Sequence, residues 1–203
     1  MAFTFFFRDY QTLECIQEHV IPVLKTRRYM RIWDAGCAMG PEPFTLSIML
    51  RENMGAFLFR NVKILATDID NSNLFGKIIR EGIYSREETG RIPLPLFEKY
   101  FTQAADKPGY TVINEEIRRS VEYLRHDLLK FQAPRTGFCL IVCKNVLLHF
   151  NREEQVKVID MFADSLEPGG FLAMEQTQKM PENVAHKFDL VVSNAQLFQK
   201  VKA

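Results

Sequence analysis

The sequence lacks several features that would decide its function at once. None of its apolar runs is long enough to cross a bilayer. The first residues have neither the basic start nor the small-residue cleavage site of a secretory signal. The four cysteines (Cys15, Cys37, Cys139 and Cys143) form no Cys-x-x-Cys pair and have no histidine at ligand spacing. We therefore expect a cytoplasmic protein with no metal site, no disulfide and no membrane insertion.

An excess of one charge is also missing. The chain has 26 basic and 25 acidic residues, which gives a net charge of +1. This balance does not indicate binding to nucleic acid or to an anionic membrane. Apolar residues make up 47% and charged residues 25%, as in an ordinary globular protein. The length of 203 residues suits one sizeable domain with a small appendage.

Short apolar runs alternate with helical patterns along the chain. We expect strands at 30–36, 63–70, 138–144 and 171–175, and helices from Pro41 to about Asn53, from Asn71 to near Gly82 and from Asn151 to Leu166. This alternation predicts a parallel sheet with helices on its faces. Residues 188–201 have the pattern of a closing hairpin. The expected fold class is thus α/β, a doubly wound, seven-stranded, mostly parallel Rossmann-like sheet whose last strand is antiparallel.

A second, smaller unit is expected between the strands at 63–70 and 138–144. Residues 110–113, an Asn-Glu-Glu turn and residues 117–125 have the pattern of a β-hairpin. The end of that segment, residues 121–127, is expected to join the main sheet as a strand. We interpret residues 1–203 as one domain in which residues 102–120 form an inserted small β-hairpin subdomain.

The loop that follows the first strand contains two glycines, in the order Asp34-Ala35-Gly36-Cys37-Ala38-Met39-Gly40. Ligands of doubly wound sheets bind at the carboxyl ends of the strands, and glycine lets a backbone approach a ligand closely. The loop does not have the form G-x-G-x-x-G, and no Gly-Lys-Ser/Thr follows it, which argues against dinucleotide and P-loop sites. A tight turn without a ligand stays the alternative.

Acidic residues end the next two strands. Asp68, at the tip of the second strand, is placed to accept both hydroxyls of a ribose, whereas Asp70 is expected to cap a helix or to be solvated. Asp127 could accept from an adenine amino group while Leu128 packs on the ring. A glycine loop and two acids without a phosphate clamp favour S-adenosylmethionine over NAD or ATP.

Several segments together resemble the CheR family of chemotaxis receptor methyltransferases, which convert receptor glutamates to methyl esters. The segments are Thr4-Phe5-Phe6-Phe7-Arg8-Asp9, Gly36 to Leu46, Ala66 to Asp70, Gly82-Ile83-Tyr84, Tyr100-Phe101 and Cys143 to Phe150. The resemblance spans nearly the whole chain. It implies a class I methyltransferase of signal transduction that uses S-adenosyl-L-methionine and releases S-adenosyl-L-homocysteine.

The resemblance also implies a role for individual residues. The implied cofactor-binding residues are Thr4, Arg8, Gly36, Gly40, Glu42, Asp68, Asp127, Leu128 and Asn145, and the implied catalytic residues are Arg8, Asn145 and His149. The implied partner is a protein substrate, namely the cytoplasmic helical region of a receptor. The small β-subdomain matches the one that docks a receptor tail by strand addition in some members.

Three differences from the family pattern concern the substrate. We expect the family's amino-terminal helical domain to be missing, since the chain starts at its Phe-Phe-Arg motif. Gly40-Pro41-Glu42-Pro43-Phe44 replaces Gly-Glu-Glu-Pro-Tyr and removes one carboxylate, and His149 replaces a tyrosine. A glutamate is already ionised at pH 7, so we interpret His149 as shaping the substrate end more than moving a proton. The alternatives are a methyltransferase of the same fold with another substrate and a non-catalytic module that binds the cofactor.

Overall fold

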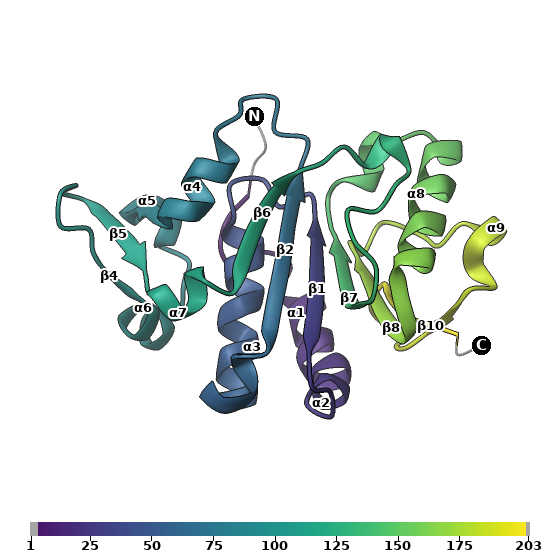
Figure 1. The fold of residues 1–203 in the computed structure, drawn as a ribbon, viewed down its shortest axis with the longest axis horizontal. Helices are drawn as coiled ribbons and strands as arrows, with labels where there is room; N and C mark the ends of the chain where they lie inside the picture. Colours follow the sequence, from purple (N-terminus) through teal and green to yellow (C-terminus); the bar gives the residue numbers. More distant parts are fainter. Residues whose placement is uncertain (1–3, 202–203) are drawn as a thin grey trace.

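The main sheet has seven strands in the order β6-β2-β1-β7-β8-β10-β9, in a computed structural model that describes residues 4–201. The five strands from β6 to β8 are parallel, and β10 is antiparallel to both of its neighbours (Figure 1). The strands of this sheet are β1 (Met30–Ala35), β2 (Val62–Asp68), β6 (Val121–Arg125), β7 (Phe138–Cys143), β8 (Leu166–Met174), β9 (Phe188–Leu190) and β10 (Leu197–Lys200). The predicted doubly wound sheet is confirmed.

Helical segments cover both faces of this sheet. They are α1 (Tyr10–Cys15), η1 (Ile16–Val20), α2 (Ile21–Leu24), α3 (Pro41–Phe59), α4 (Phe75–Glu81), α5 (Arg86–Thr89), α6 (Leu94–Tyr100), α7 (Glu115–Arg118), η2 (Leu128–Lys130), η3 (Leu147–His149), α8 (Arg152–Ser165) and α9 (Glu182–Ala185). The helices from α1 to α3 form one core with the strand residues Ile32 and Ile64, and α8 forms a second core with Trp33 and Leu65. Neighbouring residues of one strand thus serve opposite faces.

The apolar residues of the central strands account for the burial of these strands. All six residues of β7 are buried, as expected of a parallel strand that is covered on both faces. The predicted capping box of α8 is confirmed: the Asn151 side chain accepts from the Glu154 N–H at 3.0 Å, and the Glu154 carboxylate accepts from the Asn151 N–H at 2.9 Å. Helix α3 extends past its predicted end near Asn53. Gly55, at φ 74°, interrupts the helical backbone soon after that point, and the helix then resumes to Phe59.

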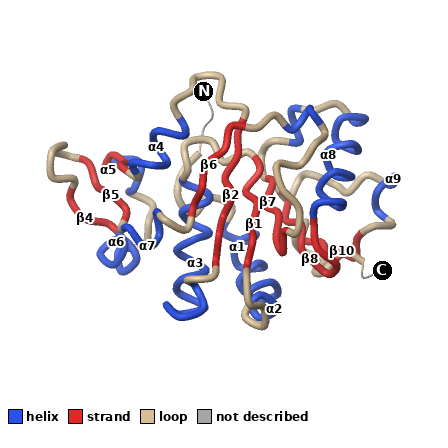
Figure 2. Tube along the Cα trace, in the orientation of Figure 1, coloured by secondary structure: helices blue, strands red, loops and turns tan. Residues whose placement is uncertain are grey.

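The small antiparallel sheet has other strands than predicted. Strand β5 (Tyr110–Ile113) pairs with β3 (Ile83–Ser85) and β4 (Phe101–Gln103), beside the main sheet (Figure 2). The predicted pairing of β5 with residues 117–125 is wrong, because Asn114 starts helix α7 by accepting the Ile117 N–H at 3.0 Å. Residues 121–125 form β6 of the main sheet, as predicted. The assignment of residues 102–120 as an inserted subdomain stays a prediction.

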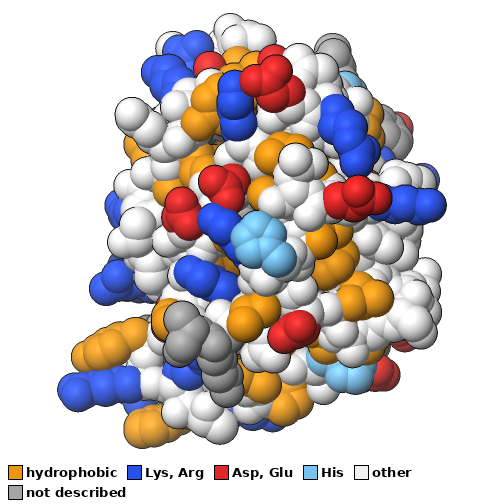
Figure 3. All heavy atoms as spheres, turned by 90° about the vertical axis from the view of Figure 1, so that its right-hand side faces the viewer, with side chains coloured by type: hydrophobic (Ala, Val, Ile, Leu, Met, Phe, Trp, Pro, Cys, Tyr) orange, Lys and Arg blue, Asp and Glu red, His pale blue; other side chains and the backbone are white. Residues whose placement is uncertain are grey.

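The side of the molecule formed by α8 and α9 carries no dominant charge. Figure 3 shows acidic, basic and apolar side chains interspersed there. Within residues 4–201, no helix combines the length and the apolar character needed to cross a membrane.

Candidate active site

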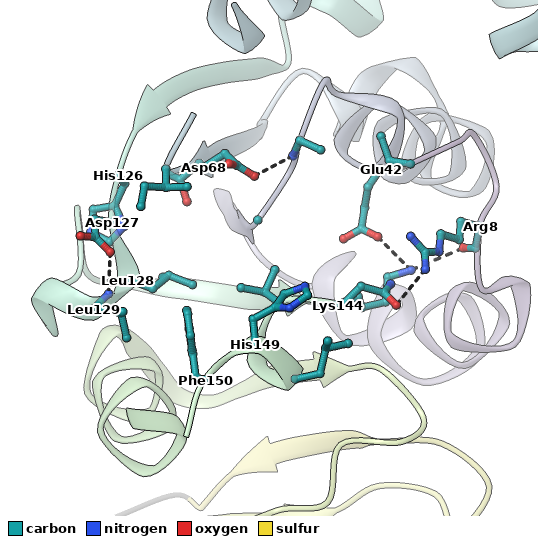
Figure 4. A pocket seen from close by; sticks show the side chains of 18 residues that line it. Arg8, Glu42, Asp68, His126, Asp127, Leu128, Leu129, Lys144, His149 and Phe150 are labelled. Atoms are coloured by element: carbon teal, nitrogen blue, oxygen red, sulfur yellow. Dashed lines mark hydrogen bonds and ion pairs between the residues drawn. The ribbon is translucent and has the colours of Figure 1, made fainter. Parts of the chain in front are cut away.

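A pocket of about 600 Å³ opens at the carboxyl edge of the main sheet. The loops that follow β1, β2, β6 and β7 meet the amino-terminal segment there (Figure 4). Its size is typical of small-molecule sites. It is lined by Thr4, Arg8, Gly36, Ala38, Glu42, Thr67, Asp68, Ile69, His126, Asp127, Leu128, Leu129, Lys144, Asn145, Val146, Leu148, His149 and Phe150.

This pocket brings together nearly all of the predicted site residues. Those that line it are Thr4, Arg8, Gly36, Glu42, Asp68, Asp127, Leu128, Asn145 and His149. Gly40 is not among the lining residues. It precedes α3 at φ 102°, and a Cβ atom there would lie 2.7 Å from Ile79 Cγ1 and 2.7 Å from Tyr84 Oη. Packing behind the pocket therefore explains this glycine, while the roles of the other residues stay predictions.

Asp68 fastens the glycine loop to the tip of β2. Its Oδ2 accepts the Ala38 N–H at 3.0 Å, and its Oδ1 accepts the Asp70 N–H at 3.1 Å. The loop runs close to the segment after β7, since a Cβ atom on Gly36 would lie 2.1 Å from Val146 Cγ2. Each carboxylate oxygen can accept more than one hydrogen bond. Asp68 can therefore also accept from the two hydroxyls of a ribose.

Asp70 has a structural role and does not line the pocket. Its buried carboxylate accepts from four donors: the N–H groups of Leu74 (3.2 Å) and Phe75 (3.0 Å) and the hydroxyls of Ser72 (2.8 Å) and Tyr123 (3.0 Å). Burial acts to raise the pKa of Asp70, but these donors outweigh it and lower the pKa below its usual value. Asp70 thus accepts N–H groups at the start of α4, but the N-cap residue is Leu74 and not Asp70. The predicted helix start at Asn71 is wrong, because α4 begins at Phe75.

One end of the pocket combines apolar side chains with one carboxylate. Ile69 and Leu129 keep 48% and 37% of their surface exposed and lie in the pocket lining with Leu128. Asp127 Oδ1 accepts the Leu129 N–H at 3.0 Å. The His126 ring is fixed by an edge contact with Trp33 at 5.7 Å between centroids. Such surroundings suit a flat nucleobase that carries an amino group.

The other end holds Arg8 in a fixed orientation. Its Nη2 donates to Asn145 Oδ1 at 2.9 Å, and Asn145 Nδ2 donates to Asp9 Oδ2 at 3.2 Å. The Asn145 N–H donates to Glu175 Oε2 at 2.6 Å. Asp9 and Asn145 are left-handed, with φ of 55° and 59°, a conformation that costs about 1–3 kcal/mol and is often found at functional sites. A guanidinium held in this way can bind a carboxylate through two parallel hydrogen bonds.

Lys144 forms the centre of a buried charge cluster. Its Nζ lies 3.0 Å from Glu42 Oε2 and 3.6 Å from Asp9 Oδ2, and it donates to the Arg8 carbonyl oxygen at 3.4 Å. Burial acts to lower the pKa of Lys144, but the carboxylates of Glu42 and Asp9 outweigh it, and the pKa lies above its usual value. The ammonium group therefore stays charged and neutralises Glu42.

The sequence reasoning missed Lys144, Asp34 and Glu175. A signal existed for Lys144, since it directly follows the unbroken apolar run of β7 at the edge where ligands bind. Glu175 likewise directly follows β8. Asp34 also carried a signal, because it opens the Asp-x-Gly loop motif at the end of the first strand. Among residues 4–201, no three His, Cys, Asp or Glu side chains gather as metal ligands would.

The pattern of one protein family matches this chain. A family model described as "CheR methyltransferase, SAM binding domain" aligns with residues 2–197. The chain belongs to the CheR methyltransferase family. The resemblance of the sequence motifs to this family is thereby confirmed.

Individual proteins agree with that family. A chemotaxis protein methyltransferase of Vibrio parahaemolyticus is 30% identical over 98% of this chain and 72% of its own length. One of Listeria innocua is 34% identical over 82% of this chain and 61% of its own length. A solved TehB-like SAM-dependent methyltransferase of Corynebacterium glutamicum has a TM-score of 0.50 and 14% identity and covers 96% of both chains. At that identity the last of these likenesses concerns the fold alone.

Proposed function

We propose that this CheR-family chain transfers a methyl group from S-adenosylmethionine to glutamate side chains of a chemotaxis receptor-like protein in the cytoplasm. The observation that carries the proposal is one pocket with Asp68 at its nucleoside end and the Arg8–Asn145 pair at its other end. Membership of the family and the names of the relatives support methyl transfer in chemotaxis. The methyl ester product is supported by the chemistry of the pocket.

The residues present fit the proposed cofactor. Asp68 would accept the ribose hydroxyls, Asp127 and Leu128 would hold the adenine, and Glu42 would face the ammonium group of the methionine part, beside Gly36 and Thr4. When bound, the cofactor supplies a methyl group on a positively charged sulfur that leaves readily. Asp68 has no ion-pair partner among the described residues and gives this part of the pocket a negative charge that suits a cation.

The protein needs to orient the substrate but not to deprotonate it. A glutamate with an ordinary pKa near 4.3 is an anion at pH 7. Arg8 would pair with that carboxylate, and Asn145 fixes the guanidinium at 2.9 Å. Holding the reacting groups in line can contribute a large part of the rate enhancement. No side chain is required to act as a general base, so His149 would shape the substrate end.

Two further features would select the substrate. Leu148, 52% exposed, stands next to His149 in the lining of the pocket. Together they offer an apolar and an aromatic contact to a helical substrate. The small sheet leaves β3 and β4 as its edges, and a receptor tail could add there as a further strand.

The test is methylation with methyl-labelled S-adenosylmethionine and a purified receptor cytoplasmic domain. We expect the receptor to be labelled and the label to be released as methanol in base, because methyl esters hydrolyse there and N-methyl groups do not. Arg8→Ala should remove most of the labelling. A base-stable label would contradict the glutamate substrate, and the absence of any label would contradict the transferase activity.

A further inference from the structure

Asp34 is a buried acid that the proposed reaction does not use. It lies in β1, and its side chain is completely buried. In the part of the chain that the structure describes, neither of its carboxyl oxygens accepts a hydrogen bond from an N–H or hydroxyl donor. A carboxylate in such a place has lost its water and gained no donor, so the charged form is strongly disfavoured.

The surroundings of Asp34 indicate where its proton goes. The charged groups near enough to act on the titration of Asp34 are Glu42 of α3, Lys144 after β7 and Asp68 at the tip of β2. Glu42 is the one within hydrogen-bonding reach of the Asp34 carboxyl. Burial and then the charge of Glu42 raise the pKa of Asp34 well above its usual range, and Lys144 offsets only part of this.

Glu42 is the ionised member of this pair of acids. Its Oε2 takes the Lys144 ammonium at 3.0 Å, and its side chain reaches the pocket, whereas Asp34 does not line it. Two carboxyl groups in contact do not both ionise. The acid without an ammonium partner and without water keeps its proton.

We propose that Asp34 is a neutral carboxylic acid that donates a hydrogen bond to the Glu42 carboxylate and thereby positions it in the pocket. Glu42 is then held by two donors, Asp34 of β1 and Lys144, which directly follows β7. Because Glu42 lines the pocket, its carboxylate can still accept a hydrogen bond from a cationic group of a bound ligand. Asp34 is on this view a positioning residue, because it acts on the ligand only through Glu42. The inference rests on the proposed function in one respect, namely that Glu42 faces the ammonium group of S-adenosylmethionine.

The first experiment compares Asp34→Leu with Asp34→Asn by calorimetric titration with S-adenosylhomocysteine. Leucine has a similar size but no donor, and we expect it to weaken binding about tenfold, which is about 1.4 kcal/mol. Asparagine donates from its amide and should restore most of that loss. If asparagine is as damaging as leucine, Asp34 acts as an anion and the proposal is wrong. If leucine binds like the wild type, Asp34 positions nothing.

A double-mutant cycle separates positioning from general damage to the fold. In a Glu42→Gln background, Asp34→Leu should cause little further loss of affinity, because its target has changed. An undiminished additional loss would contradict an action through Glu42. Thermal melts of each variant show whether the protein remains folded.

Infrared difference spectroscopy tests the protonation state without any ligand. Wild type should show the C=O stretch of a protonated carboxylic acid at neutral pH, and Asp34→Asn should lack that band. An unchanged spectrum would overturn the proposal. If the wild type bound no S-adenosylhomocysteine, the proposed function would fail, while this band would still decide the state of Asp34.

Discussion

The two edges of the main sheet differ in charge. The carboxyl edge gathers the acids Asp34, Glu42, Asp68, Asp127 and Glu175 in and behind the pocket, together with the cations Arg8 and Lys144. The amino edge exposes the cations Arg28, Arg31, Arg60 and Lys63, and none of these forms an ion pair with another described residue. Residues 19–33 and 53–67, which lead into β1 and β2, contain no acid at all. The acids at the carboxyl edge are thus partly paired with buried or fixed cations, whereas the amino ends of β1 and β2 expose cations without acidic partners among the described residues.

The two edges also differ in their backbone. At the carboxyl edge, left-handed conformations fall on the non-glycine residues Asp9 (φ 55°), Ala38 (φ 46°) and Asn145 (φ 59°). At the amino edge, the positive φ angles of 74° and 76° belong to Gly55 and Gly137, which adopt them without strain. Strain of about 1–3 kcal/mol per residue is thus accepted where side chains must be aimed. The comparison indicates that the strained left-handed backbone serves the geometry of the site and is not required by the fold.

The largest expected effect is on stability, at Lys144. Replacing it by methionine leaves the Glu42 carboxylate largely buried without its partner, and breaking a buried pair costs about 3–5 kcal/mol. Urea unfolding should show a loss of this size. The matched control is Lys63→Met at the amino edge, an exposed lysine whose loss should change stability by at most about 0.5 kcal/mol. Equal effects at both positions would remove the contrast between the edges.

The contribution of Lys144 should also depend on pH in a defined direction. Its pKa is raised above the ordinary value of 10.5 in the folded state. Its stabilising effect is therefore complete below that ordinary value and is lost as the pH rises through the folded pKa. Unfolding curves of the wild type and Lys144→Met should stay apart at pH 7 to 9 and approach each other only in stronger alkali. Convergence already near pH 8 would contradict the raised pKa.

The next effect is on turnover, at Arg8. Arg8→Ala should lower kcat/KM about 100-fold, because the substrate carboxylate is no longer held in line, while the affinity for S-adenosylhomocysteine changes little. Lysine should restore only part of the activity, since an ammonium lacks the planar fork of a guanidinium. Steady-state methylation assays and calorimetric titrations measure the two quantities. Full activity of Arg8→Ala would remove this residue from the site.

Asp70→Ala should destabilise the protein by about 2 kcal/mol, because the N–H groups of Leu74 and Phe75 and the hydroxyls of Ser72 and Tyr123 lose their acceptor. The folded pKa of Asp70 is lowered, so its contribution is present above its ordinary pKa and is lost as the pH falls through the folded value. Wild type should therefore lose stability below about pH 4 more steeply than Asp70→Asn. Urea midpoints between pH 3 and pH 7 test this. A parallel course of both proteins would refute the role of the carboxylate.

Local patterns explain how much of the fold the sequence could predict. The capping box at Asn151 and the apolar run of β7 lie within one element each, and both were predicted correctly. The partners of β5 were not, because pairing with β3 and β4 joins residues far apart in the chain. The Asn-Glu-Glu segment fits a turn as well as a helix start, and only the cap formed by Asn114 decides between them.

The site, too, could be predicted only where the signal was local in the sequence. Asp68 and Asp70 could be told apart from their positions at the end of a strand and before a helix. Lys144 looks like an ordinary surface lysine in the sequence, although its side chain is 1% exposed. Its partners come from α3 and from the amino-terminal segment, so its burial follows from tertiary packing alone. The protonation of Asp34 depends on the same packing.

Calorimetric titration of Asp68→Ala with S-adenosylhomocysteine tests the central claim most directly, namely that the carboxyl edge is a nucleoside site. Hydrogen bonds to charged groups contribute about 1.5–3 kcal/mol each, so losing two should weaken binding about 100-fold or more. Asp68→Asn should be milder, since its amide oxygen still accepts. Thermal melts control for the lost contact with the Ala38 N–H. If folded Asp68→Ala binds like the wild type, or if the wild type prefers NAD, the pocket has been assigned wrongly.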